Sequence, residues 1–104
     1  MTYGLFTGFT AHPGRGAELL DVLLAAAEAL RADPACLHYV AGTAEDDPDA
    51  VWVWEAWIDR AAHDAALEPP EVRAAIARAR PLLAGTAGRT AVRLHAGKGL
   101  PGGG

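Results

Sequence analysis

The side chains best suited to move a proton in this 104-residue sequence are four histidines and one isolated glutamate. His63 follows a tryptophan-rich stretch, and imidazole can take a proton near neutral pH, which suits a general base. Glu55 is the most polar residue of that stretch, and a buried carboxylate requires polar partners. Each residue also has an ordinary alternative, because His63 can be a solvent-facing helix histidine and Glu55 a member of a structural ion pair.

His38 and Tyr39 are further candidates. They are adjacent in a predicted strand, so they point to opposite faces of the sheet and at most one can share a face with Glu55. If the hairpin that joins the two strands is symmetric, His38 lies opposite or diagonal to Glu55. Such a cross-strand pair would satisfy the carboxylate and raise the basicity of the histidine.

Several other site chemistries are not supported by the sequence. It contains no glycine-rich phosphate loop and no nucleophile elbow. The histidines fall in four different predicted elements, so their spacing does not indicate a metal site; they are His12, His38, His63 and His95. The acidic run 45–49 lacks the ligand spacing of a calcium loop and is better interpreted as a polar hairpin turn. We therefore expect no metal.

Charge and cysteine content restrict the partners and the compartment. The net charge is −4, and no basic patch is visible in the sequence, whereas binding to nucleic acid or to an anionic membrane requires one. Cys36 is the only cysteine, which excludes an intrachain disulfide and favours a reducing compartment. No basic segment precedes the first apolar residues, and no apolar run reaches the roughly 20 residues of a membrane span. We expect a cytoplasmic protein.

The element that must position these side chains is residues 50–59 (AVWVWEAWID), predicted as a strand. Val51, Val53, Glu55 and Trp57 share one face, and Trp52, Trp54, Ala56 and Ile58 share the other. Both faces are largely apolar, so both need cover, and a chain with few helices can hardly supply it alone. We therefore expect a second copy of the chain to lie behind the sheet, so that the protein is a homodimer.

The remaining chain supplies three more strands and three helical segments. Strands are predicted at 3–11, 36–44 and 85–96 from their alternating patterns. The leucine stripe of 16–32 predicts an amphipathic helix that ends before Asp33-Pro34. Asp59 can cap a short helix over 60–67, and Pro70 suits the first turn of another that ends before Pro81. Gly4 and Gly8 flank Phe6 on one face of the first strand, which indicates a bulge, tight packing or a ligand contact.

This order, β-α-β-β-α-α-β, is typical of an α+β ferredoxin-like split βαβ sandwich, with helices on one face of an antiparallel sheet. A symmetry mate on the other face would give a dimeric α+β barrel. We expect a single domain over residues 1–96 and a flexible glycine-rich tail over 97–104.

Several of these motifs together resemble one known family. They are the first strand ending in His12-Pro13-Gly14, the leucine helix, Cys36-Leu37-His38-Tyr39, and Glu55-Ala56-Trp57 followed by Ala61-Ala62-His63, Leu67, Pro70 and Pro81-Leu82-Leu83. Over about residues 3–96 the chain resembles the antibiotic biosynthesis monooxygenase domain, including its quinol monooxygenase type. The order of elements is distinctive, although no single motif is.

The resemblance implies a homodimer that oxidises a phenolic, quinol or anthrone-like polyketide with molecular oxygen and without metal, flavin or other cofactor. An electron-rich aromatic anion can itself give an electron to oxygen, so the protein need only bind, deprotonate and stabilise it. By resemblance, His63 rims a cleft between sheet and helices and Trp57 lines it, with Glu55 as the third catalytic candidate. The candidates for substrate binding are Tyr39, His38, Phe6 and Arg93. Of these, Arg93 could hold a substrate oxyanion or could simply be an exposed strand residue.

The chain also departs from the family. Ala66 and Glu71 stand where many members carry histidines, which leaves His63 alone in the site. The haem-degrading branch is disfavoured, because the first strand lacks its asparagine and the matching helix positions are Ala65 and Ala77. Fold does not fix function, so an isomerase of a small metabolite and a non-catalytic small-molecule-binding module stay as alternatives.

Overall fold

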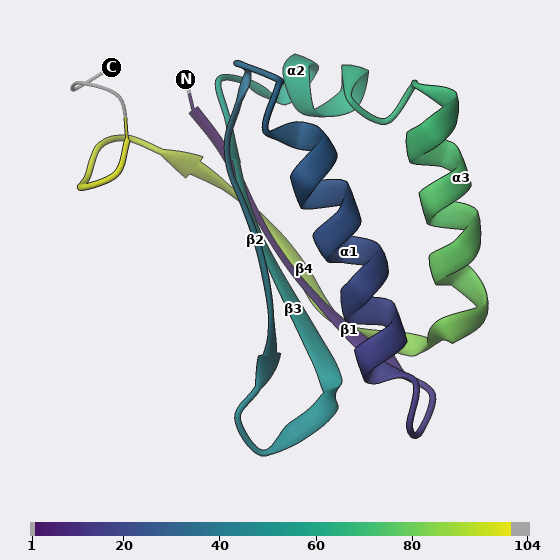
Figure 1. The fold of residues 1–104 in the computed structure, drawn as a ribbon. Helices are drawn as coiled ribbons and strands as arrows, with labels where there is room; N and C mark the ends of the chain where they lie inside the picture. The colour runs from purple at the N-terminus through teal and green to yellow at the C-terminus, as the bar shows by residue number, and fades with distance from the viewer. Residues whose placement is uncertain (1, 101–104) are drawn as a thin grey trace.

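A computed structural model describes residues 2–100 (Figure 1). The elements follow the predicted order, with one additional turn of 3-10 helix before the last strand. They are β1 (Thr2–Ala11), α1 (Gly16–Leu30), β2 (Cys36–Ala44), β3 (Asp47–Trp57), α2 (Arg60–Ala65), α3 (Pro70–Ala79), η1 (Arg80–Leu82) and β4 (Leu83–Leu94).

The four strands form one antiparallel sheet in the order β2-β3-β1-β4. The helices lie on one side of it, with α1 in front of the sheet, α3 beyond α1, and α2 across the top of the view (Figure 1). This is the predicted α+β ferredoxin-like arrangement. It gives the sheet a helix-facing side and an open side.

The core lies between the helix-facing side of the sheet and α1. Val51, Val53 and Trp57 of β3 are buried there, and so is Leu19 from the predicted leucine stripe. The next residue along β3 from Val51, Trp52, is 45% exposed because it points to the open side. The alternation predicted for this strand is therefore confirmed.

Two helix starts follow from local chemistry. The Asp59 side chain accepts a hydrogen bond from Ala62 N at 2.7 Å, as an N-cap residue does, and thereby fixes where α2 begins. Pro70 occupies the first turn of α3, where the missing N–H has no intrahelical acceptor in any case. Both predicted starts are confirmed, and the two helices end one or two residues before the predicted limits.

The β2–β3 hairpin differs from the symmetric turn expected over 45–49. Ala44 pairs with Asp47 across a two-residue turn, but the next partners are Thr43 and Val51, so residues 48–50 form a bulge. Within the bulge, the Asp49 carboxylate accepts hydrogen bonds from Gly14 N at 3.0 Å and Gly16 N at 2.9 Å. The bulge thereby ties β3 to the loop before α1.

The open side of the sheet carries most of the exposed aromatic surface. The rings of Phe6 and Trp54 lie 4.3 Å apart between centroids. A Cβ at Gly4 would lie 2.9 Å from the Trp54 ring, and one at Gly8 would lie 2.7 Å from Trp52. The glycines of β1 therefore mark tight packing, because the tryptophan rings lie directly over them.

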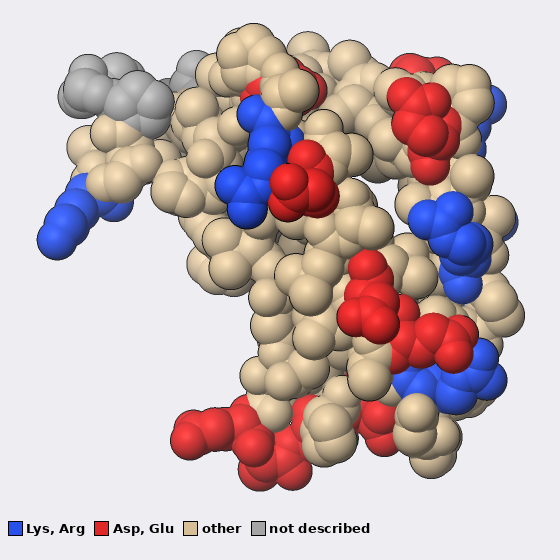
Figure 2. Space-filling model, viewed as in Figure 1, with Lys and Arg blue, Asp and Glu red and all other residues tan. Residues whose placement is uncertain are grey.

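The end of the described chain returns to this side of the sheet. Residues 97–100 form a turn in which the Gly99 carbonyl oxygen lies 2.9 Å from His38 Nε2, and the rest of the predicted flexible tail, 101–104, lies outside the described residues. Within residues 2–100, no helix is long and apolar enough to cross a membrane. On the face shown in Figure 2, acidic side chains gather at the hairpin tip and no continuous basic surface is visible.

Candidate active site

The candidate site is a buried cluster where β1 and β3 meet α2. His63 of α2 is only 5% exposed, and its ring contacts two aromatic rings of the sheet. The centroid distances are 5.3 Å to Tyr3 and 5.7 Å to Trp57, the latter an edge-on contact. The solvent-facing alternative for His63 is therefore wrong, because α2 turns this residue inward onto the sheet.

Glu55 lies beside this imidazole. Its Oε1 accepts a hydrogen bond from Trp57 Nε1 at 3.1 Å and stands 3.9 Å from His63 Nε2. Glu55 and Trp57 share a face because they are two residues apart in a strand. The spacing Glu-x-Trp is thus the geometry that lets an indole N–H satisfy a carboxylate on the same face.

Asp64 orients the histidine from the other side. Its Oδ1 lies 3.0 Å from His63 Nδ1, and a carboxylate can only accept, so Nδ1 carries the proton and Nε2 has the free lone pair when the ring is neutral. The 3.9 Å between Nε2 and Glu55 is longer than a hydrogen bond. Among the described residues, His63 Nε2 therefore makes no hydrogen bond.

The surroundings of Glu55 shift its protonation equilibrium toward the neutral carboxyl group. Burial raises the pKa of Glu55 above its usual value, while the Trp57 N–H, His63 and Arg89 each act to lower it. Burial, followed by the charge of Glu55, likewise raises the pKa of the Tyr39 phenol well above its ordinary value. A carboxyl group with a raised pKa next to an imidazole can hold a proton that the imidazole has accepted.

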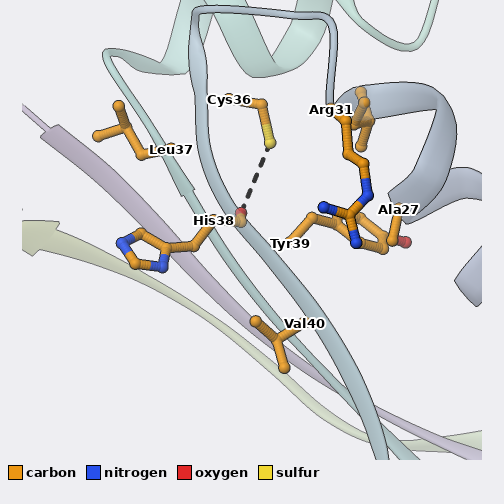
Figure 3. A pocket seen from close by; sticks show the side chains of 8 residues that line it. Ala27, Arg31, Cys36, Leu37, His38, Tyr39 and Val40 are labelled. Atoms are coloured by element: carbon orange, nitrogen blue, oxygen red, sulfur yellow. Dashed lines mark hydrogen bonds between the residues drawn. The ribbon is translucent and has the colours of Figure 1, made fainter. Parts of the chain in front are cut away.

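Two surface pockets flank the cluster. One, of about 450 Å³, lies at the edge strand β4 and is lined by Thr2, Tyr3, Arg60, Ala91, Val92 and Arg93. The other, of about 400 Å³, lies between the end of α1 and β2 (Figure 3) and is lined by Ala27, Leu30, Arg31 and residues 36–40. Tyr3 belongs to the first pocket and contacts His63, so this pocket is one side chain away from the imidazole.

The structure separates His38 from Tyr39 as strand geometry requires. Tyr39 pairs with Glu55, whereas His38 pairs with Ala56. Figure 3 shows Tyr39 directed toward Arg31 and Ala27 of α1, with His38 on the opposite side of the strand. The predicted His38–Glu55 pair is wrong, because the strands pair in the register of Thr43 with Val51, which sets Tyr39 opposite Glu55 and His38 opposite Ala56.

The other predicted residues divide in the same way. Phe6 pairs with Trp54 and lies on the open side, 47% exposed, so the sheet separates it from His63. Arg93 pairs with Tyr3 and therefore lies on the helix-facing side, in the β4 pocket. The structure thus brings together His63, Glu55 and Trp57, with Tyr39 and Arg93 at the two flanks, and leaves His38 and Phe6 on the far face.

Sequence reasoning missed Tyr3, Asp64 and Arg60. The alternation of β1 contained the signal for Tyr3, because a strand that places Gly4 and Phe6 on one face places Tyr3 on the other. Asp64 directly follows His63, but only the folded helix shows that its carboxylate bends back to Nδ1. Among residues 2–100, no three His, Cys, Asp or Glu side chains lie close enough together to hold a metal ion.

Comparison with known proteins gives one family match. The model of the family described as "antibiotic biosynthesis monooxygenase" matches residues 2–78, which contain His63, Glu55 and Trp57. No curated protein sequence matches the chain significantly.

Solved structures show the same fold over nearly the whole chain. A candidate antibiotic biosynthesis monooxygenase from Chloroflexus aurantiacus J-10-fl is 35% identical, with a TM-score of 0.85 and 100% of both chains covered. A candidate of the same type from Deinococcus radiodurans is 23% identical, with a TM-score of 0.78 and coverage of 98% of this chain and 100% of that one. SnoaB, a cofactor-independent oxygenase from Streptomyces nogalater, is 18% identical, with a TM-score of 0.78 and coverage of 93% and 96%. The last two similarities show the fold alone.

Proposed function

The chain belongs to the antibiotic biosynthesis monooxygenase family, and from this premise we propose that it is a cofactor-independent monooxygenase of a phenolic, quinol or anthrone-like aromatic. The observation that carries the proposal is the buried imidazole of His63, which contacts two aromatic rings and faces the partly buried carboxylate of Glu55. An aromatic wall with one base beside it suits a flat, weakly acidic substrate.

In the proposed reaction, His63 Nε2 takes a proton from the substrate, and Asp64 stabilises the resulting imidazolium through Nδ1. The electron-rich anion gives one electron to molecular oxygen, and the radical and superoxide combine to form a carbon–oxygen bond. Cleavage of the O–O bond then releases water and leaves a carbonyl group where the substrate carried hydrogen. One oxygen atom enters the product and the other leaves as water.

Glu55 has a positioning and proton-holding part in this proposal. Trp57 holds its carboxylate within 3.9 Å of Nε2, so an imidazolium formed there meets a negative charge in surroundings from which most water is excluded. Because burial raises the pKa of Glu55, the carboxyl group can also accept the transferred proton.

We further propose that the open side of the sheet is covered by a second copy of the chain. Phe6 and Trp52 are each about half exposed, and Val40 is 58% exposed. A four-stranded sheet with apolar residues on both faces requires cover on both. Light scattering combined with size-exclusion chromatography should therefore give the mass of a dimer.

Oxygen uptake by chelator-treated protein, with a panel of quinols and anthrones, tests the activity. We expect uptake above the uncatalysed rate for at least one substrate, with a loss of about 100-fold or more in His63→Ala. His95→Ala is the matched control, because His95 is exposed just beyond β4. Turnover without oxygen consumption would instead identify an isomerase, and ligand binding unchanged in His63→Ala without turnover would identify a binding module.

A further inference from the structure

The β4 pocket combines positive charge with a lining residue, Tyr3, whose ring contacts His63. Arg60 and Arg93 are among its six lining residues, and none of the six is acidic. Two guanidinium groups beside one shallow, open pocket can together bind a carboxylate or a phosphate group.

The sheet register places Arg93 in line with the cluster. Trp57, Tyr3 and Arg93 form one cross-strand row over β3, β1 and β4, all on the helix-facing side. Neighbours in such a row have Cβ atoms about 4.5–5.5 Å apart. His63 contacts the first two members of the row, so Arg93 lies one strand spacing beyond the histidine contacts.

Neither arginine is held by a strong ion pair. Arg60 lies 4.0 Å from Asp64, at the limit of an ion pair, and both side chains are exposed, so this contact contributes little. No carboxylate lies within ion-pair distance of Arg93 among the described residues. An incoming anion could therefore bind both guanidinium groups without displacing a buried partner.

We propose that the β4 pocket is a subsite for a permanently anionic substituent of the substrate, a carboxylate or a phosphate, bound by Arg93 and Arg60. The inference rests on the proposed function, because it places the aromatic ring against Tyr3 with its reactive position toward His63. It narrows the substrate class to acidic aromatics, such as phenolic or quinol acids and their phosphorylated equivalents.

Anaerobic isothermal titration calorimetry tests the subsite without turnover. The first probes are 2,5-dihydroxybenzoate and its methyl ester, which share a quinol ring and differ in the charge of one substituent. We expect the acid to bind about tenfold or more tightly than the ester, with an affinity that falls as salt is added. Arg93→Gln should reduce the preference to about twofold or less, and Arg60→Gln should reduce it in part.

Arg78→Gln is the control, since Arg78 is exposed on α3 and lies outside the pocket, and it should retain the preference. Benzoate and phenyl phosphate then identify the anion, because the one whose affinity depends more strongly on Arg93 carries the preferred group. Equal affinities for acid and ester, or a preference that survives Arg93→Gln, would overturn the proposal.

The outcome is distinguishable from failure of the proposed function. An anion preference that depends on Arg93, in a protein that consumes no oxygen with any substrate, would reject the monooxygenase and keep the subsite. Oxygen uptake that depends on His63 but does not distinguish acid from ester would keep the monooxygenase and reject the subsite.

Discussion

The hydrogen bond from Trp57 to Glu55 should be worth far more than a surface contact, because Trp57 is buried and little of the Glu55 side chain is exposed. The indole N–H donates over 3.1 Å to a carboxylate whose side chain is 12% exposed. A hydrogen bond to a buried charged group contributes about 1.5–3 kcal/mol. Trp57→Phe keeps most of the ring but removes the donor, so we expect it to lower the free energy of unfolding by about 3 kcal/mol, including the lost ring volume.

A double-mutant cycle isolates the bond from the lost volume. Glu55→Met removes the carboxylate with little change of shape and leaves the indole N–H without an acceptor. Trp57→Phe combined with Glu55→Met leaves neither group unpaired, so its cost should be smaller than the sum of the single costs by about 1.5–3 kcal/mol.

The assay is urea unfolding at one fixed pH and one fixed protein concentration, so that protonation and any association are held constant. Glu45→Met is the matched control for the carboxylate change, and it should leave the free energy of unfolding nearly unchanged because Glu45 is exposed in the hairpin turn. If the costs of Trp57→Phe and Glu55→Met add within about 0.5 kcal/mol, the indole–carboxylate bond does not stabilise the site and the reasoning fails.

Three further results are expected. Gly16→Ala should lower the free energy of unfolding by about 3 kcal/mol or more in thermal or urea unfolding, because a Cβ there would collide with the Pro48 carbonyl oxygen, whereas Gly42→Ala, in open space, should have little effect. Trp54→Lys should give a monomer by analytical ultracentrifugation, because it places a charge in the proposed interface; an unchanged mass would reject that interface. The raised pKa of Glu55 means that the folded state binds its proton more tightly than the unfolded state does, which stabilises the fold at low pH. This contribution to stability is complete below the unfolded pKa of about 4.3 and is lost as the pH rises through the folded pKa. Glu55→Gln should therefore gain stability relative to wild type between pH 4 and pH 8, and a constant difference over that range would show that the carboxyl group does not titrate as inferred.

Local rules were sufficient for much of the fold. The leucine stripe of α1, the Asp59 cap and the prolines at helix ends are short-range signals. The structure follows the cap and the prolines, and it buries Leu19 of the stripe but leaves Leu24 46% exposed. Strand alternation likewise predicts which side chains of β3 face the helices. This alternation and the position of α2 after β3 were sufficient to predict that Glu55, Trp57 and His63 lie together.

The form of the β2–β3 turn was not within reach of the sequence, although the pairing was. A symmetric turn over 45–49 sets Ala44 opposite Ala50 and Tyr39 opposite Glu55, which is the observed pairing of Tyr39. A regular hairpin continued from the Ala44–Asp47 pair would place His38 on the face of Glu55. The three extra residues 48–50 shift the pairing by an odd number, so that Tyr39, and not His38, lies on the face of Glu55. Nothing in the acidic run itself distinguishes a loose turn from a tight turn followed by a bulge, since Asp and Pro suit both.

The bulge at residues 48–50 also determines how this scaffold can change by insertion and deletion. Removing one of its residues would turn β2 over relative to β3 and bring His38 beside Glu55 in place of Tyr39. Both faces of β2 are partly buried in the present fold. Turning the strand over would therefore not expose a face that is now fully buried. Length variation in one hairpin can therefore exchange a phenol for an imidazole at the site while every residue of α2 and β1 stays in place.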